Sequence, residues 1–98
     1  MKENSSCKKS HHSHHQKEKL INRLSRIEGQ VRGIKKMIDE DVYCDDILNQ
    51  VSAVQSSISS FSRELLEHHL KSCVVRRIQQ DDGEVVDELL KTFRKLMK

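Results

Sequence analysis

The feature that most constrains this chain is a long stretch without helix-breaking residues. Between Gly33 and Gly83 the sequence contains neither glycine nor proline, so little in it would interrupt an α-helix. We therefore predict one long helix from about Asp45 to Gln79. Because an α-helix rises about 1.5 Å per residue, residues at its two ends cannot meet within one chain.

Apolar residues predict two further helices, one on either side of the long helix. From Gln16 to about Asp39 they recur at alternating spacings of four and three, which is typical of an amphipathic helix with a coiled-coil seam. The seam residues are Leu20, Leu24, Ile27, Val31, Ile34 and Ile38. We place a tight connection at residues 40–44, with Asp41 as the N-cap of the long helix. A turn at residues 81–83 precedes a short C-terminal helix.

Composition indicates one small all-α domain. The chain has 98 residues, no proline and no tryptophan, and 34% of its residues are charged. We assign residues 16–98 to a single helical domain and residues 1–15 to a disordered, His-rich tail. A tail of this kind can collect Cu, Ni or Zn weakly, but we place the tail and Cys7 outside the main site. A three-helix monomer buries little apolar surface, so we expect oligomerisation.

Several classes of protein do not fit the sequence. No apolar run approaches the roughly 20 residues of a membrane span, and residues 1–15 lack the apolar core of a signal peptide, so we expect a cytoplasmic protein. Three cysteines, an odd number, favour free thiols, metal binding or redox sensing over a disulfide framework in a reducing compartment. The phosphate-loop and nucleophile motifs of common enzymes are missing, and an enzyme is not expected.

Cys44, His69 and Cys73 form the pattern C-x24-H-x3-C, which suggests a soft-metal site. On a helix, His69 and Cys73 share one face about 6 Å apart. Cys44 lies roughly 37 Å away along the same helix. An antiparallel second chain would bring its own Cys44 beside the pair, and two-fold symmetry would create two equal sites. Two sulfurs and one nitrogen suit Cu(I) better than Mg, Ca or Mn.

Other interpretations of these three residues stay open. Zinc would usually take a fourth ligand, which Glu88, His68 or a tail histidine could supply. A redox site needs only Cys44 and Cys73, joined across a dimer by a disulfide or polysulfide link. In a purely structural interpretation, Cys73 is a core thiol, His69 a surface imidazole and Cys44 a loop residue.

Positive charge is concentrated on the first helix. Residues 17–36 carry seven Lys or Arg against two Glu, a net charge of +5, whereas the whole chain carries +3. The basic face comprises Lys19, Arg23, Arg26 and Lys36, flanked by Arg32 and Lys35. Such a face can bind phosphates through counterion release, although a solvated helix face would look the same. There is no short helix-turn-helix signature and no zinc-finger spacing.

Four segments taken together resemble the copper-sensitive operon repressor (CsoR) family. They are Arg26-Ile27-Glu28-Gly29-Gln30-Val31-Arg32-Gly33, Tyr43-Cys44, Ser52-Ala53-Val54-Gln55-Ser56-Ser57 and His69-x3-Cys73. The resemblance spans about residues 17–97. It implies a three-helix protomer, an antiparallel four-helix-bundle dimer and a dimer of dimers. It also implies a repressor that binds operator DNA in the apo form and releases it on binding Cu(I), which derepresses copper-efflux genes.

The resemblance also assigns roles by position. It implies that Cys44, His69 and Cys73 are the copper ligands, with Tyr43 and Glu88 as outer residues that link the site to the bundle. Two positions implicated in DNA binding match Arg23 and Arg63, and a third is Ser60 here. With the basic first helix, the predicted DNA-binding set is Arg23, Arg26, Arg32, Lys35, Lys36 and Arg63.

The same resemblance bears on the choice of ligand. Relatives that sense nickel or cobalt have histidine at the position of Cys73, and sulfur sensors lack the imidazole of His69. The C-H-C set therefore favours copper. A persulfide or redox sensor using Cys44 and Cys73, and a Zn- or Ni-responsive repressor, are the alternatives.

Overall fold

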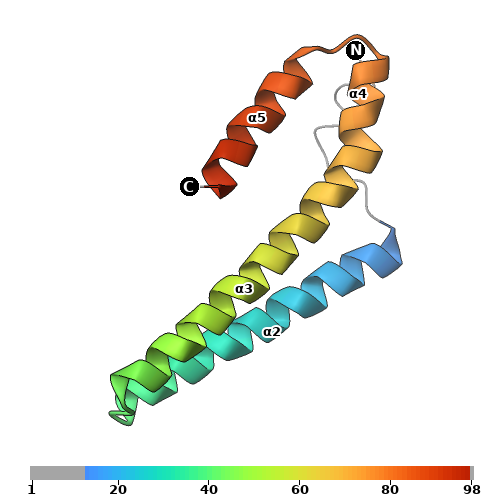
Figure 1. Ribbon diagram of the computed structural model, residues 1–98. Coiled ribbons are helices and arrows are strands. Elements are labelled where there is room, and N and C mark those ends of the chain that lie inside the picture. The colour runs from blue at the N-terminus through green and yellow to red at the C-terminus, as the bar shows by residue number, and fades with distance from the viewer. Residues whose placement is uncertain (1–12, 98) are drawn as a thin grey trace. The chain divides into compact units, whose positions relative to one another are not determined.

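The computed structural model describes residues 13–97, and these residues are helical apart from short turns (Figure 1). The elements are α2 (His14–Asp39), α3 (Cys44–His69), the π-helical segment η1 (Leu70–Val74), α4 (Val75–Gln79) and α5 (Glu84–Leu96). Because α3, η1 and α4 follow one another without a break, residues 13–97 form three helical stretches, as the sequence predicted. The helices belong to two compact units, one ending at Leu65 and one beginning at Leu66.

Helix α2 begins two residues earlier than predicted. The N–H of Gln16 donates to Oγ of Ser13 at 3.1 Å, and Oε1 of Gln16 accepts from the N–H of Ser13 at 3.2 Å. This reciprocal capping box satisfies N–H groups that have no partner inside the helix. His14 and His15 therefore belong to α2, which corrects the predicted tail boundary at residue 15. The rest of the predicted tail, residues 1–12, lies outside the described residues.

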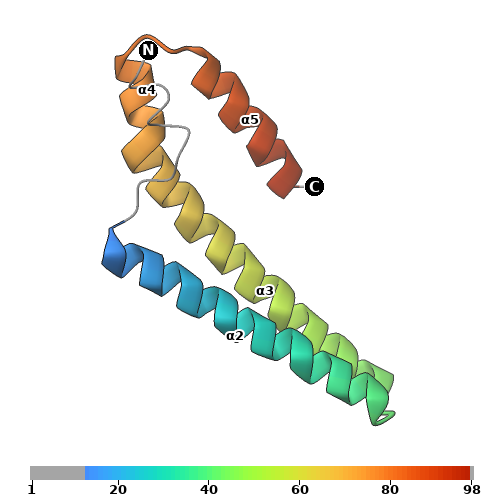
Figure 2. The same cartoon turned by 180° about the vertical axis from the view of Figure 1, so that it is seen from behind.

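In the first unit, α2 and the adjoining part of α3 form an antiparallel helical hairpin, which both views show (Figures 1 and 2). Leu20 and Ile27 of α2 and Val54 of α3 are buried. The alternate seam residues of α2 are not covered: Leu24 and Val31 are each 44% exposed and Ile38 is 61% exposed. One edge of the predicted seam thus packs inside the hairpin, and the other is an open apolar edge.

Asp41 ends α2 rather than capping α3, so its predicted role was wrong. Its φ is 56°, in the left-handed region. The N–H of Asp41 donates to the carbonyl of Ile38, and that of Val42 donates to Met37. These two bonds form a Schellman motif. Aspartate tolerates the left-handed conformation better than most residues other than glycine, which explains a sharp turn without glycine.

In the second unit, a left-handed aspartate also ends a helix with a Schellman motif. Asp81 has a φ of 62°, its N–H donates to Ile78, and the N–H of Asp82 donates to Arg77. Gly83, the glycine of the predicted turn, has an ordinary φ of −67°. After this turn α5 begins, and its Val85 is almost fully buried at 1% exposure.

A π-helical turn interrupts the long predicted helix. The N–H of Val75 donates to the carbonyl of Leu70, five residues earlier, whereas an α-helix uses a spacing of four. Each such turn accommodates one extra residue. This shifts the apolar stripe around the helix, and it accounts for the change in the sequence pattern from Leu65 towards Cys73 and Val74. The prediction of an uninterrupted α-helix to Gln79 was wrong for residues 70–74.

Candidate metal centre and nucleic-acid interface

Cys44 is the first residue of α3, and its side chain is exposed. The preceding residue, Tyr43, is 73% exposed. The carbonyl of Tyr43 accepts from the N–H groups of Asp46 and Ile47 at 3.1 and 3.2 Å, so the backbone of Tyr43 caps the helix. Cys44 is therefore fixed at a helix end while its thiol faces outward.

His69 and Cys73 lie at the opposite end of the same helix. His69 is the last residue of α3 and is exposed. Cys73 lies in η1, and only 4% of its surface is exposed. The predicted α-helical stacking of these two residues has to be corrected, because the wider turn of η1 follows His69. One side chain of the pair faces solvent and the other is buried.

The three predicted ligands are not gathered in the single chain. Among residues 13–97, no group of three or more His, Cys, Asp or Glu lies close enough to hold a metal ion. Within the same range, neither Cys44 nor Cys73 is disulfide-bonded. Cys44 begins a helix of 26 residues that His69 ends, and such a helix is about 39 Å long.

Glu88, the predicted outer residue, is bound by an arginine that sequence reasoning missed. Arg77 Nη1 donates to Glu88 Oε1 at 2.7 Å, and Arg77 Nε donates to Asp82 Oδ2 at 2.7 Å. The side chain of Arg77 is 6% exposed and that of Asp82 is 14% exposed, whereas that of Glu88 is 55% exposed. We call these three residues the Arg77 clasp. It ties α4, the following turn and α5 together.

Electrostatics keep the clasp charged. The hydrogen bonds to Asp82 and then to Glu88 raise the pKa of Arg77 above its already high ordinary value, against the opposing effect of burial. A group whose pKa is raised on folding stabilises the fold at every pH below its pKa in the unfolded chain. This stabilisation is lost only as the pH rises through the pKa of the folded state. Arg77 therefore stabilises the fold across the whole neutral pH range.

The predicted DNA-binding residues divide into two groups. Arg32, Lys35 and Lys36 are exposed along the C-terminal half of α2. Arg23, Arg26 and Arg63 instead line two adjoining grooves of the hairpin. The structure thus brings the second group together on one polar surface.

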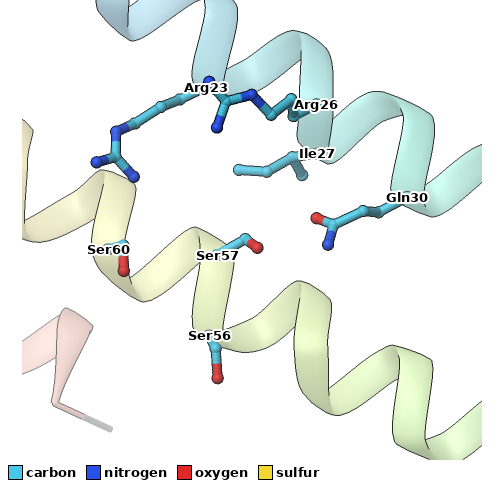
Figure 3. Close-up of a pocket in the computed structure, with 7 residues that line it drawn as sticks. All are labelled: Arg23, Arg26, Ile27, Gln30, Ser56, Ser57 and Ser60. Carbon is cyan, nitrogen blue, oxygen red and sulfur yellow. The ribbon is translucent and has the colours of Figure 1, made fainter.

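The larger groove, of about 340 Å³, lies between α2 and α3 (Figure 3). Its lining residues are Arg23, Arg26, Ile27, Gln30, Ser56, Ser57 and Ser60. Arg23 reaches from α2 towards α3 near Ser60, and Gln30 reaches across at the other end. The second groove, of about 290 Å³, shares Ser56 and Ser60 with the first and adds Arg63. Hydroxyl, amide and guanidinium groups of this kind are typical phosphate-contacting groups.

A carboxylate from α3 lies beside this surface. Glu64 Oε1 is 2.6 Å from Arg23 Nε, and Glu64 Oε2 is 3.3 Å from Lys19 Nζ. The Glu64 side chain is only 14% exposed, whereas those of Arg23 and Lys19 are 37% and 58% exposed. The basic face of α2 is therefore partly neutralised at its N-terminal end. Sequence reasoning missed Glu64 because it lies on another helix.

The sequence matches a known protein family over most of its length. Residues 16–95 match the family described as metal-sensitive transcriptional repressors. The chain belongs to this family. This match confirms the predicted resemblance. The family consists of transcriptional repressors, as expected for a chain that is not an enzyme.

Two relatives of this repressor are close in sequence. The copper-sensing transcriptional repressor CsoR of Bacillus subtilis (strain 168) is 48% identical over 89 residues, covering 90% of this chain and 88% of the relative. The copper-sensing transcriptional repressor RicR of Mycobacterium tuberculosis (strain ATCC 25618 / H37Rv) is 48% identical over 76 residues, covering 74% of this chain and 79% of the relative.

Solved structures confirm the fold of this repressor. The copper-sensing repressor CsoR with Cu(I) from Geobacillus thermodenitrificans NG80-2 matches with a TM-score of 0.85 and 38% identity, over 90% of this chain and 93% of that one. The nickel-responsive transcriptional regulator InrS matches with a TM-score of 0.72 and 35% identity, over 87% and 97%. No helix among residues 13–97 is both long and apolar enough to cross a membrane.

Proposed function

We propose that this repressor responds to Cu(I): it binds operator DNA in the apo form and releases it when Cu(I) binds, which derepresses copper-efflux genes. The observation that carries the proposal is the donor set of Cys44, His69 and Cys73 in a chain that is 48% identical to two copper-sensing repressors. Two thiolates and one imidazole, with no carboxylate, suit a soft monovalent ion of low coordination number. Bound copper would supply a link between these three side chains.

The metal site is proposed to be shared between two chains. The length of α3 supports this, because Cys44 begins the helix and His69 ends it. An antiparallel partner would place its own Cys44 beside His69 and Cys73. The open apolar edge of α2 also supports assembly, since exposed apolar surface of this kind marks interfaces. We propose the four-helix-bundle dimer and the dimer of dimers on these grounds.

Further roles follow from the same proposal. The helical region from α2 onward would act as one metal-sensing and DNA-binding domain, preceded by the remainder of the His-rich tail. Operator binding would place the protein in the cytoplasm. Tyr43 and Glu88 would link the metal site to the bundle, and the exposure of Tyr43 beside Cys44 is compatible with contact to a partner chain. The DNA-binding residues would be Arg23, Arg26, Arg32, Lys35, Lys36 and Arg63.

The decisive experiment is an anaerobic Cu(I) titration against a competing chelator, with the fluorescence anisotropy of a bound operator duplex followed in parallel. The duplex is selected by the apo-protein from a random-sequence pool. We expect tight Cu(I) binding together with loss of anisotropy. Zn(II), Ni(II) and polysulfide are titrated in the same way, because a zinc or nickel sensor or a persulfide sensor would respond to one of these instead. A purely structural helical protein would bind neither Cu(I) nor operator tightly.

Substitution of Arg23 tests the DNA surface. We expect Arg23→Ala to weaken operator binding at low salt, because the guanidinium lines the groove that faces phosphate in our proposal. Each lost phosphate contact should reduce the slope of log K against log salt by about 0.9. Affinity and slope are measured by anisotropy over a range of salt concentrations. Unchanged values would remove Arg23 from the contact surface.

A further inference from the structure

The contact between Glu64 and Arg23 is more specific than a surface ion pair. The carboxylate meets Nε of Arg23 at 2.6 Å, and it does so from a side chain that is 14% exposed. A guanidinium carries five N–H groups in a rigid fork. When the Nε edge is occupied by a carboxylate, the four N–H groups of the two terminal nitrogens are left for another acceptor. Glu64 thus determines which edge of Arg23 remains available.

The two terminal nitrogens of Arg23 are part of a side chain that lines the larger groove. Arg23 lines it with Arg26, Ser57 and Ser60, and Figure 3 shows its guanidinium extending from α2 towards α3. The second oxygen of Glu64 lies 3.3 Å from Lys19 Nζ, so a cation on each side holds the carboxylate in place. A part-buried carboxylate therefore orients an arginine at the rim of a polar groove.

We propose that Glu64 is a positioning residue for DNA binding: it holds Arg23 by Nε so that both terminal nitrogens face one phosphate of the operator backbone. Arg26, Ser57 and Ser60 complete the phosphate subsite. Bidentate recognition of this kind depends on the orientation of the guanidinium as well as on its charge. The proposal rests on operator binding, and it makes an acidic residue necessary for affinity towards a polyanion.

If Glu64 acts only through its charge, or if it instead positions Arg23, substitution of Glu64 is expected to change operator affinity in opposite directions. Glu64→Met and Glu64→Gln both remove one negative charge beside the basic face. If Glu64 acts only through charge, both variants bind operator more tightly and with a steeper salt dependence, since Arg23 and Lys19 are released. If Glu64 positions Arg23, Glu64→Met binds about fivefold more weakly, the loss expected for one partly exposed ion pair. Glu64→Gln, which loses the charge that attracts Arg23, is then weakened as well.

A matched control and a double-mutant cycle complete the experiment. Glu67 lies on the same helix and pairs with Lys71 at 3.2 Å, so Glu67→Met removes the same charge without touching Arg23. In an Arg23→Met background, Glu64→Met should no longer weaken operator binding, because Glu64 acts through Arg23. All variants are compared by anisotropy on the selected operator duplex, after circular dichroism has shown native helicity.

The possible outcomes separate this inference from the proposed function. The inference is supported if the single variant Glu64→Met binds operator more weakly and if this weakening is absent in the Arg23→Met background. Tighter binding by Glu64→Met, or an equal effect in both backgrounds, would overturn it while operator binding by the wild type stands. A wild-type protein that selects no duplex would overturn the proposed function and the inference with it.

Discussion

Replacing His69 with alanine is expected to separate DNA binding from copper sensing. In our proposal the wild-type protein loses operator affinity by a factor of about 5 to 150 on binding Cu(I), the usual range for allosteric coupling. His69→Ala should bind operator as well as the wild type, because His69 lies outside the grooves that hold the arginines. The ratio of its affinities without and with Cu(I) should fall to near one, since the imidazole ligand is lost.

Operator anisotropy measured with increasing Cu(I) gives both affinities in one titration. The neighbouring His68 supplies a matched control, because His68→Ala removes an imidazole and leaves the proposed C-H-C set intact. Release of operator from His69→Ala at stoichiometric Cu(I) would exclude His69 from the switch. If His68→Ala also lost its response, the fourth-ligand arrangement of a zinc site would gain support.

Loss of the Arg77 clasp is expected to have the largest effect on stability. Arg77→Met should lower the free energy of unfolding by about 3 kcal/mol, because it removes the buried cation that pairs with both Asp82 and Glu88. For a domain of this size, that loss corresponds to a fall in melting temperature on the order of 15 °C. Urea and thermal unfolding followed by circular dichroism measure both quantities. Protomer concentration must be held constant, since assembly contributes to the apparent stability.

Two controls identify the cause. Arg76 is adjacent and exposed, so Arg76→Met removes the same charge from the surface and should change stability little. The triple variant Arg77→Met, Asp82→Asn, Glu88→Gln should recover much of the loss, since no charge is left without its partner. If Arg77→Met and Arg76→Met had the same stability, the clasp would not contribute to the fold.

Much of the fold was predictable because it depends on local pattern. The spacing of apolar residues gave α2, and the stretch without glycine or proline gave the long helix from Cys44 to Gln79. The π-turn at Leu70–Val74 was not predictable in this way, because it is a change of one residue in hydrogen-bond spacing and no glycine or proline marks it. Asp41 was misassigned because aspartate serves both as an N-cap and as a left-handed residue.

The candidate sites were predictable only in part, and for a different reason. The pattern of Cys44, His69 and Cys73 is visible in sequence order, as is the basic face of α2. Glu64 and Arg77 act through partners outside their own helices, so the spacing of residues along one helix does not reveal these pairs. An acidic residue within an otherwise Ser-rich helix segment, and an arginine just before an acidic turn, were the only sequence signals. Their importance became clear only from the distances to Arg23 and Glu88.

Within residues 13–97, the turns that follow α2 and α4 could be made more stable. Asp41 and Asp81 both hold the left-handed conformation, which costs an L-residue with a side chain roughly 1–2 kcal/mol and costs glycine almost nothing. Glycine at these positions would lose part of that gain through the greater freedom of the unfolded chain. Neither aspartate belongs to the proposed metal site, the DNA surface or the Arg77 clasp. These two turns are therefore the places where a more stable form of this repressor could be engineered with the proposed metal switch left intact.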